Sequence, residues 1–304
     1  MNTLKPTAIY IETTNKCNAK CIMCPNTKMT RKRAVMSEQI FEKTIDAISN
    51  LDLNDLQLFL HKEGEPLLDP DITARIKHAK NQLPNLKELI INTNAMLLTE
   101  KTSIELLESG LDTIYFSIDG ASPETYNNIR LGLDYDSIAS NVEKFFETHN
   151  KNKSNVKVIM QMLTDKHNMH EVDLFKKKWE DKKCEFYIKP MHCYLDGGSS
   201  SFQPDKSNYQ LNVCDDPFRM MVIYADGSIG VCCWDYDNLY KVGHIDDDSL
   251  IKIFNNKKFT YLRDMQLKKN CSNIDPCNRC MRIYGNDTIA KLEPNTSQQK
   301  IFKH

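Results

Sequence analysis

Short apolar runs typical of β-strands alternate with amphipathic helical stretches along the first two thirds of the chain. The predicted strands span 8–11, 56–60, 86–91, 113–117, 156–162 and 186–189. Such alternation is typical of repeated βα units that build a parallel sheet. Six units are two fewer than a closed (β/α)₈ barrel requires. The pattern therefore predicts an α/β fold with a partial, open (β/α)₆ TIM-like barrel.

Capping residues mark several helix boundaries between these strands. Ser37 is predicted to be the N-cap of a helix with a single apolar stripe. A second helix is expected over 71–80. The helix after the third strand ends near Gly110, where a left-handed C-cap fits a glycine.

The last third of the chain has a different pattern. Two apolar runs flank Asp226-Gly227, a dipeptide that tolerates the positive φ of a tight hairpin turn. A helical segment is expected over 249–267, and an irregular cysteine loop over 271–280. We therefore expect a partial barrel over 1–190, a linker over 191–213, a small β-hairpin and helix domain over 214–290, and a polar tail over 291–304.

Composition limits the class of protein. The chain has 304 residues, of which 40% are hydrophobic and 27% charged, as in ordinary soluble globular proteins. No 18-residue apolar run or signal-peptide pattern occurs, so we expect a cytoplasmic protein without a membrane partner. The net charge of −1 argues against nucleic acid as a partner.

Eleven cysteines are the most informative feature of the composition. In an intracellular chain they indicate metal binding or catalysis rather than disulfides. Cys17, Cys21 and Cys24 lie within eight residues of one another, and the next cysteine is Cys184. The distribution therefore predicts two separate sites.

The first site has the spacing Cys17-x₃-Cys21-x₂-Cys24, directly after the first strand. A structural zinc ion almost always takes four protein ligands. Three thiolates suit a [4Fe–4S] cluster whose fourth iron stays open to another ligand. We therefore expect such a cluster at the carboxyl end of the first strand.

The second site has Cys214 and Cys232, followed by Cys277-x₂-Cys280. Four thiolates can hold either zinc or a second [4Fe–4S] cluster, and spacing alone slightly favours zinc. Four cysteines remain outside both sets: Cys184, Cys193, Cys233 and Cys271. Each of these has a simple explanation as a small buried apolar side chain or a free thiol.

The segment CNAKCIMC resembles the cluster-binding loop of the radical S-adenosylmethionine (radical SAM) superfamily. The resemblance implies that Cys17, Cys21 and Cys24 hold the cluster and that SAM chelates the fourth iron. Electron transfer then cleaves SAM to a 5′-deoxyadenosyl radical. Met23 stands where the family often has an aromatic residue, and its backbone is implied to contact the adenine.

The same resemblance implies SAM contacts from residues at the strand ends. They are Gly64, Glu65, Pro66, Asn94, Ser117, Asp119, Arg130 and Gln161. Gly64-Glu65-Pro66 resembles the family's GGEP motif, which lies along the methionine moiety, although Glu63 replaces the first glycine. Asp119 is implied to bind a ribose hydroxyl, and Arg130 to lie near the cofactor carboxylate. In barrel-like α/β folds these carboxyl ends form the active face.

The C-terminal segment resembles the SPASM or shorter twitch domain of many radical SAM enzymes, which shifts the expectation from zinc to an auxiliary [4Fe–4S] cluster. No cysteine follows Cys280, so one auxiliary cluster fits better than two. The cysteine spacing is particularly similar to that of the aminocyclitol dehydrogenases of butirosin biosynthesis.

The implied reaction is hydrogen abstraction from an unactivated carbon, with oxidation of a secondary alcohol on a sugar or aminocyclitol as the leading hypothesis. The first alternative is epimerisation, with Cys193 or Cys233 as the hydrogen donor. Modification of a peptide is a further alternative, disfavoured because no additional domain precedes the first strand. A flavodoxin- or ferredoxin-like protein is implied as electron donor. The non-enzymatic rival is a zinc-binding interaction protein.

Overall fold

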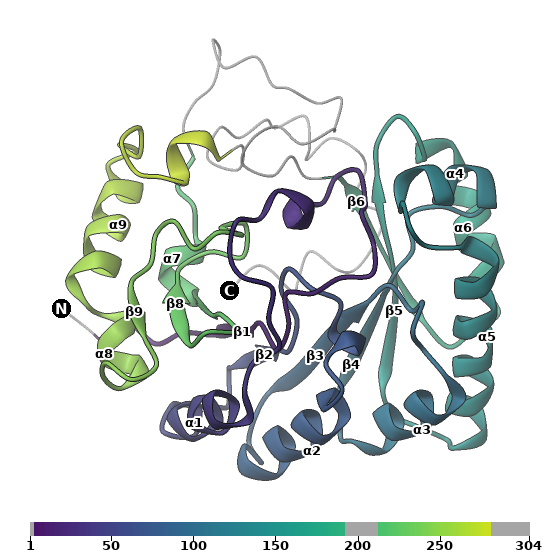
Figure 1. Ribbon diagram of the computed structural model, residues 1–304, viewed down its shortest axis with the longest axis horizontal. Coiled ribbons are helices and arrows are strands. Elements are labelled where there is room, and N and C mark those ends of the chain that lie inside the picture. The colour runs from purple at the N-terminus through teal and green to yellow at the C-terminus, as the bar shows by residue number, and fades with distance from the viewer. Residues whose placement is uncertain (1–2, 192–211, 281–304) are drawn as a thin grey trace.

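A mixed β-sheet forms the centre of the molecule in a computed structural model, which describes residues 3–191 and 212–280. Within these residues the strand order is β6-β5-β4-β3-β2-β1-β7-β8-β9 (Figure 1). The first six strands are β1 (Ala8–Ile11), β2 (Gln57–Phe59), β3 (Glu88–Thr93), β4 (Thr113–Ser117), β5 (Lys157–Thr164) and β6 (Glu185–Pro190). Neighbours among these six pair in parallel. The predicted open, partial barrel is confirmed.

Helices connect the parallel strands, and Figure 1 shows most of them in an arc along one side of the sheet. They are α1 (Glu38–Ser49), α2 (Ile72–Gln82), α3 (Glu100–Glu108), α4 (Pro123–Ile129), α5 (Tyr135–Lys151) and α6 (Val172–Trp179). The Ser37 side chain accepts a hydrogen bond from the Ile40 amide at 3.2 Å, which confirms the predicted N-cap. Gly110 has φ +87°, as expected for a left-handed residue after a helix.

Aromatic side chains fill the layer between the sheet and these helices. Phe116 of β4 meets Phe145 of α5 edge to face, with ring centroids 5.0 Å apart. Phe146 of α5 lies 6.2 Å from Trp179 of α6. All four side chains are fully buried, so the carboxyl ends of the strands stand on a well-packed support.

The C-terminal elements continue the same sheet. They are α7 (Asp216–Arg219), β7 (Met220–Ile223), β8 (Ser228–Gly230), β9 (Gly243–His244), α8 (Leu250–Phe254) and α9 (Lys257–Leu267). β7 pairs in parallel with β1, and β8 returns antiparallel as the predicted hairpin. Gly227 has φ +80°, which its turn requires. The hairpin therefore brings the segment after β8 beside the segment that follows β1.

The helical segment expected over 249–267 is divided into α8 and α9. The division has a local cause, because the Asn256 side chain accepts hydrogen bonds from the amides of Lys258 and Phe259, both at 3.0 Å. This cap starts a new helix. Cys193, most of the expected linker and the expected tail lie outside the described residues, so the domain boundaries stay predictions. Among the described helices, none combines the length and hydropathy needed to cross a bilayer.

Candidate active site

A cavity of about 170 Å³, here called the outer cavity, lies at the carboxyl ends of β2 to β5. It brings together most of the residues that the sequence analysis selected. They are Cys17, Cys21, Met23, Cys24, Gly64, Glu65, Asn94, Ser117, Arg130 and Gln161. Pro66 and Asp119 are not among its lining residues. The remaining lining residues include His61, Lys62 and Glu63, from the segment after β2.

The cysteine loop is held on two sides. The buried Asn26 side chain donates hydrogen bonds to the carbonyls of Asn15 at 3.0 Å and Glu63 at 2.6 Å. On the other side the Lys20 amide donates to the Leu131 carbonyl at 2.7 Å, and the Ile22 amide donates to the Ile129 carbonyl at 3.0 Å. The loop is therefore fixed between the segment after β2 and the end of α4.

The segment after β2 approaches the root of this loop very closely. A Cβ atom at Gly64 would lie 2.3 Å from the Thr14 carbonyl oxygen. The Glu65 amide donates to the Lys16 carbonyl at 2.9 Å. Only glycine fits this contact, which gives the glycine of the Gly-Glu-Pro motif a structural reason.

The three thiols of the loop are shielded from water. Burial raises the pKa of Cys17 to about 11 and that of Cys24 to about 12. Burial also raises the pKa of Cys21, with Arg130 acting in the opposite direction. The described residues contain no group of three His, Cys, Asp or Glu side chains already arranged around a metal position. The fit to an iron–sulfur cluster therefore rests on three soft donors that share one cavity.

Glu65 organises the turn after β3. Its carboxylate accepts hydrogen bonds from the Thr93 hydroxyl at 2.6 Å and from the Asn94 amide at 2.8 Å. The side chain is nearly inaccessible, and burial raises its pKa while these hydrogen bonds oppose the shift. Glu65 therefore ties the carboxyl ends of β2 and β3 together at the edge of the outer cavity.

Asp119 and Arg130 form a buried ion pair. Its Oδ2 accepts from Nε and Nη2 of Arg130, both at 2.7 Å, and its Oδ1 accepts from the Leu163 amide at 2.8 Å. Burial opposes the charge on Arg130, but the Asp119 carboxylate outweighs it and raises the pKa of Arg130 well above its ordinary value. Asp119 is fully buried. The ion pair holds the Arg130 side chain in place, and the ribose contact that the resemblance implies for Asp119 stays a prediction.

The Asp119→Asn variant should bind SAM about 10- to 100-fold more weakly and keep its full iron content. The reason is that Arg130 would lose a charged hydrogen-bond acceptor, a type of contact worth about 1.5–3 kcal/mol. The dissociation constant can be measured by calorimetry on the reconstituted protein without reductant.

A matched control is Asp69→Asn, because Asp69 pairs with Arg75 in a second buried ion pair, at 3.0 Å, away from the cavity. The control should lose stability and keep its SAM affinity. Loss of iron from Asp119→Asn, with SAM affinity unchanged in the protein that retains a cluster, would contradict this role.

A second cavity, of about 240 Å³ and here called the inner cavity, continues the outer one. The two share His61, Lys62, Glu63, Asn92, Gln161 and Leu163. Its other walls are Tyr10, Phe59, Tyr115, Tyr187, Lys189, Cys233 and Trp234. Tyr10 and Phe59 stack in parallel, with ring centroids 4.2 Å apart. The inner cavity is thus largely aromatic, and Cys233 and Trp234 from the loop after β8 form part of its wall.

A row of polar side chains crosses the strands where the two cavities meet. The Ser117 hydroxyl donates to Asn92 Oδ1 at 2.6 Å, and the Gln161 side chain donates to the Ser117 oxygen at 2.8 Å. These residues lie on β3, β4 and β5. The row orients the Gln161 amide into the shared region, where a ligand could bind it.

The second cysteine set gathers between α7, β8 and α9. Burial raises the pKa of Cys277, and so do the neighbouring thiols of Cys271, Cys280 and Cys214. The pKa of Cys232 is raised well above its usual range by a hydrogen bond with Cys233 and by burial. Shielded thiols from distant segments fit an iron–sulfur cluster here as well.

Sequence reasoning missed Gln266 of α9, which joins two members of this set. Its side chain donates to Cys277 Sγ at 3.6 Å and accepts from the Cys214 amide at 3.1 Å. Gln266 is almost completely buried. Gln266 shares the buried face of α9 with Phe259 and Leu262, and only the fold shows that this polar side chain is buried.

Lys62 joins the two sites. Its buried ammonium pairs with Glu63 and donates to the carbonyls of Cys233 at 3.1 Å and Asp235 at 3.4 Å. The ammonium also lies 5.3 Å from the Tyr224 ring centroid. Lys62 therefore fixes the loop after β8 against the segment after β2.

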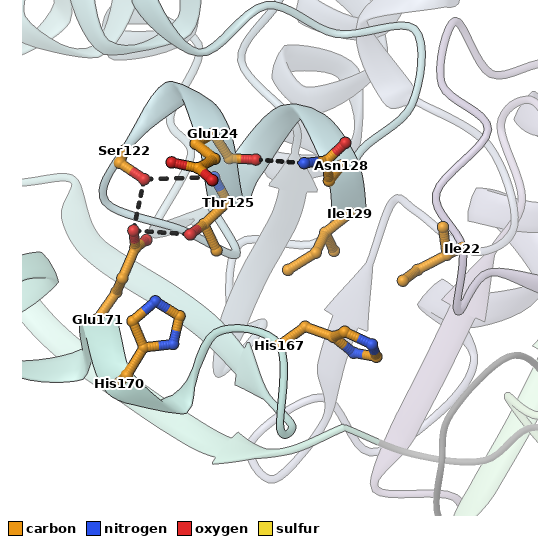
Figure 2. A pocket seen from close by; sticks show the side chains of 9 residues that line it. All are labelled: Ile22, Ser122, Glu124, Thr125, Asn128, Ile129, His167, His170 and Glu171. Carbon is orange, nitrogen blue, oxygen red and sulfur yellow. Dashed lines mark hydrogen bonds between the residues drawn. The ribbon is translucent and has the colours of Figure 1, made fainter.

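A third cavity, of about 410 Å³, lies between α4, the segment after β5 and Ile22 of the cysteine loop. Figure 2 shows that the side chains of Ser122, Thr125 and Glu171 face one another. Glu171 accepts from the Ala121 amide at 2.6 Å and from the hydroxyl groups of Ser122 and Thr125. This cavity contains none of the cluster cysteines.

Two family models match the chain. The model described as the radical SAM superfamily matches residues 11–177, which include the cysteine loop and every lining residue of the outer cavity. The SPASM model, described as an iron-sulfur cluster-binding domain, matches residues 214–281, which include all four cysteines of the second set.

Three similar proteins illustrate the range of the relatives. A protein named "Probable GTP 3′,8-cyclase" from Methanococcus maripaludis is 30% identical over 44% of this chain, and the match spans only 43% of that protein. The S-adenosyl-L-methionine-dependent 2-deoxy-scyllo-inosamine dehydrogenase of Niallia circulans is 22% identical over 90% of this chain and 92% of its own length. A crystal structure of BtrN with AdoMet and 2-DOIA superposes with a TM-score of 0.65, at 19% identity, over 92% of this chain and 94% of that one.

Proposed function

Because the chain belongs to the radical SAM superfamily, we propose that it oxidises a secondary alcohol on a small ring compound, a sugar or an aminocyclitol. The chain binds a [4Fe–4S] cluster and SAM, and it carries an additional iron–sulfur cluster-binding domain. When bound, these groups supply a 5′-deoxyadenosyl radical for hydrogen abstraction and an acceptor for the second electron. The first electron would come from a flavodoxin- or ferredoxin-like protein.

The observation that carries the proposal is the continuity of the two cavities. The outer cavity holds the three thiols of the N-terminal loop, and the inner cavity is bounded by Cys233, next to Cys232 of the second cysteine set. A substrate in the inner cavity would therefore lie between the SAM site and the additional cluster. That placement suits a reaction in which a hydrogen atom leaves on one side and an electron on the other.

The chain's own residues would bind and orient the two small molecules. Arg130, held by Asp119, would pair with the SAM carboxylate, and the Met23 backbone would contact the adenine. The stacked Tyr10 and Phe59 rings would form one wall for the substrate ring.

The size of the inner cavity supports a small substrate. Its 240 Å³ is below the range of about 300–1,000 Å³ typical of sites for drug-sized ligands. The relative from Niallia circulans is named for oxidation of an aminocyclitol and aligns over 90% of this chain. Modification of a peptide stays an expectation from the sequence.

Epimerisation is the second candidate, because Cys233 lines the inner cavity. A thiol there could return a hydrogen atom to a substrate radical. Cys193, the other candidate donor, lies outside the described residues.

Turnover in D₂O distinguishes the two candidates, with 2-deoxy-scyllo-inosamine as the probe. Oxidation should produce ketone in equal amount to 5′-deoxyadenosine, and Cys233→Ala should keep forming that ketone. Epimerisation should instead produce a redox-neutral product with one deuterium at the inverted carbon, because a thiol exchanges its hydrogen with solvent. Mass spectrometry of the product measures the difference. Deuterium incorporation that disappears in Cys233→Ala would replace oxidation by epimerisation.

A further inference from the structure

His61 presents an unsatisfied nitrogen at the junction of the two cavities. It follows β2 and lines both the outer and the inner cavity. Its Nδ1 is buried and has no hydrogen-bond partner among the described residues. Its ring packs edge to face against Tyr10 and Phe59, with centroids 5.8 Å and 5.7 Å away. The ring is thus held in place, while one of its polar atoms has no partner among the described residues, which is uncommon for a buried polar atom.

A histidine with one buried, unpartnered nitrogen is not informative by itself. His78 Nε2 and His149 Nδ1 share this feature. His78 packs against Phe41 of α1, and His149 packs against Phe145 within α5. Neither lines the outer or the inner cavity. Location therefore distinguishes His61 from the other two.

The charge state of the ring suits proton acceptance. Burial lowers the pKa of His61 to about 4, and a hydrogen bond with the backbone of Ile90 acts in the opposite direction. The imidazole is therefore neutral near pH 7. A neutral imidazole nitrogen without a partner can accept a proton from a hydroxyl group that reaches it.

The other titratable groups around the inner cavity are less suited to this task. They are Tyr10, Lys62, Glu63, Tyr115, Tyr187, Lys189 and Cys233. Burial raises the pKa values of Tyr10 and Tyr115, so both phenols keep their protons. Lys62 and Glu63 are paired with each other. Burial opposes the charge of Lys62, but Glu63 raises its pKa above the ordinary value, so this ammonium keeps its proton.

We propose that His61 Nδ1 accepts the hydroxyl proton of the substrate as the alcohol is oxidised, an inference that rests on the proposed function. The O–H bond breaks and an N–H bond forms at Nδ1. With SAM and the additional iron–sulfur cluster bound, the same carbon would give one hydrogen atom to the deoxyadenosyl radical and one electron to that cluster. Loss of a hydrogen atom, a proton and an electron converts the secondary alcohol to a ketone. His61 then returns its proton to solvent.

The test compares His61→Asn and His61→Phe with wild-type protein, using 2-deoxy-scyllo-inosamine as the probe. Asparagine places an amide near the position of Nδ1 and can hydrogen-bond the hydroxyl, but it cannot take its proton. Ketone formation by His61→Asn should fall about 100-fold or more, the usual range for loss of a proton-transfer group. Its ratio of ketone to 5′-deoxyadenosine should fall as well.

Binding of the probe without reductant gives a readout that does not depend on turnover. Calorimetry should show His61→Asn within about threefold of wild type and His61→Phe about tenfold weaker, as expected for one hydrogen bond. SAM affinity and iron content should be unchanged in both variants. His78→Asn is the matched control and should change neither binding nor turnover.

The outcomes separate the two proposals. If wild-type protein makes ketone and His61→Asn keeps that rate within about threefold, the role of His61 is overturned and the oxidation stands. If wild-type protein cleaves SAM and makes no ketone from the probe, the proposed oxidation fails and the proton transfer fails with it. Equal losses in His61→Asn and His78→Asn would indicate a structural role and would also overturn the proposal.

Discussion

Replacing Cys17, Cys21 and Cys24 together with alanine should roughly halve the iron bound per chain, from about eight atoms to about four, and abolish reductive cleavage of SAM. The three thiols are the soft donors of the outer cavity, and the loop that carries them is anchored by backbone contacts that the substitutions leave in place. The second cysteine set, on other segments, should still assemble its cluster. Iron analysis and detection of 5′-deoxyadenosine measure the two effects.

Cys184→Ala is the control for this triple variant. Cys184 is a partly exposed thiol just before β6 that lines neither cavity, and its sulfur contacts only the Trp179 carbonyl, at 3.5 Å, among the hydrogen bonds described for it. Its replacement should leave iron content and SAM cleavage unchanged. Zinc in place of iron in the wild-type protein, or normal SAM cleavage by the triple variant, would show that the N-terminal assignment is wrong.

Cys277→Ala should stop formation of the oxidised product, while 5′-deoxyadenosine still appears. The variant removes a thiol that lies among Cys214, Cys271 and Cys280 and accepts a hydrogen bond from Gln266. The N-terminal loop has no residue in this set, so the first cluster and SAM cleavage should survive. Loss of the second-electron acceptor should lower ketone formation by at least about 100-fold, a free-energy effect of about 2.7 kcal/mol.

Cys271→Ala provides the comparison, because Cys271 is a buried thiol near Cys277 that the spacing does not select. It should retain about eight iron atoms and normal product formation. If Cys271→Ala and Cys277→Ala lose iron equally, the ligand set of the second site must be revised. If Cys277→Ala still makes ketone at the wild-type rate, the additional cluster is not the electron acceptor.

The parallel strands could be located from the sequence because each needs a local apolar run. The turns could be located because they need particular residues. Gly227 and Gly110 could be placed in advance, since few other residues adopt a positive φ without strain. The division at Asn256 was missed because the apolar pattern continues across it, while one side-chain cap decides where the helix restarts.

The cysteine spacing indicated both sites for a similarly local reason. Three thiols within eight residues can meet in one loop whatever the rest of the fold, and strand ends of a parallel sheet share an edge. The outer cavity could therefore be assembled largely from the sequence. The pairing of Asp119 with Arg130 could not be predicted in this way. A carboxylate at a strand end has the same sequence signal whether it faces a ligand or a neighbouring arginine.

Tertiary structure alone decided how the two sites are joined. Lys62 and Cys233 are 171 positions apart, and Arg31 reaches the Tyr236 carbonyl across 205. Local periodicity carries no information about contacts at such separations. The pairing of β7 with β1 brings these segments together. By itself the sequence determined the strands, the turns and the thiol donors, whereas the burial of Lys62 and the unpartnered nitrogen of His61 arise only when distant segments pack and exclude water.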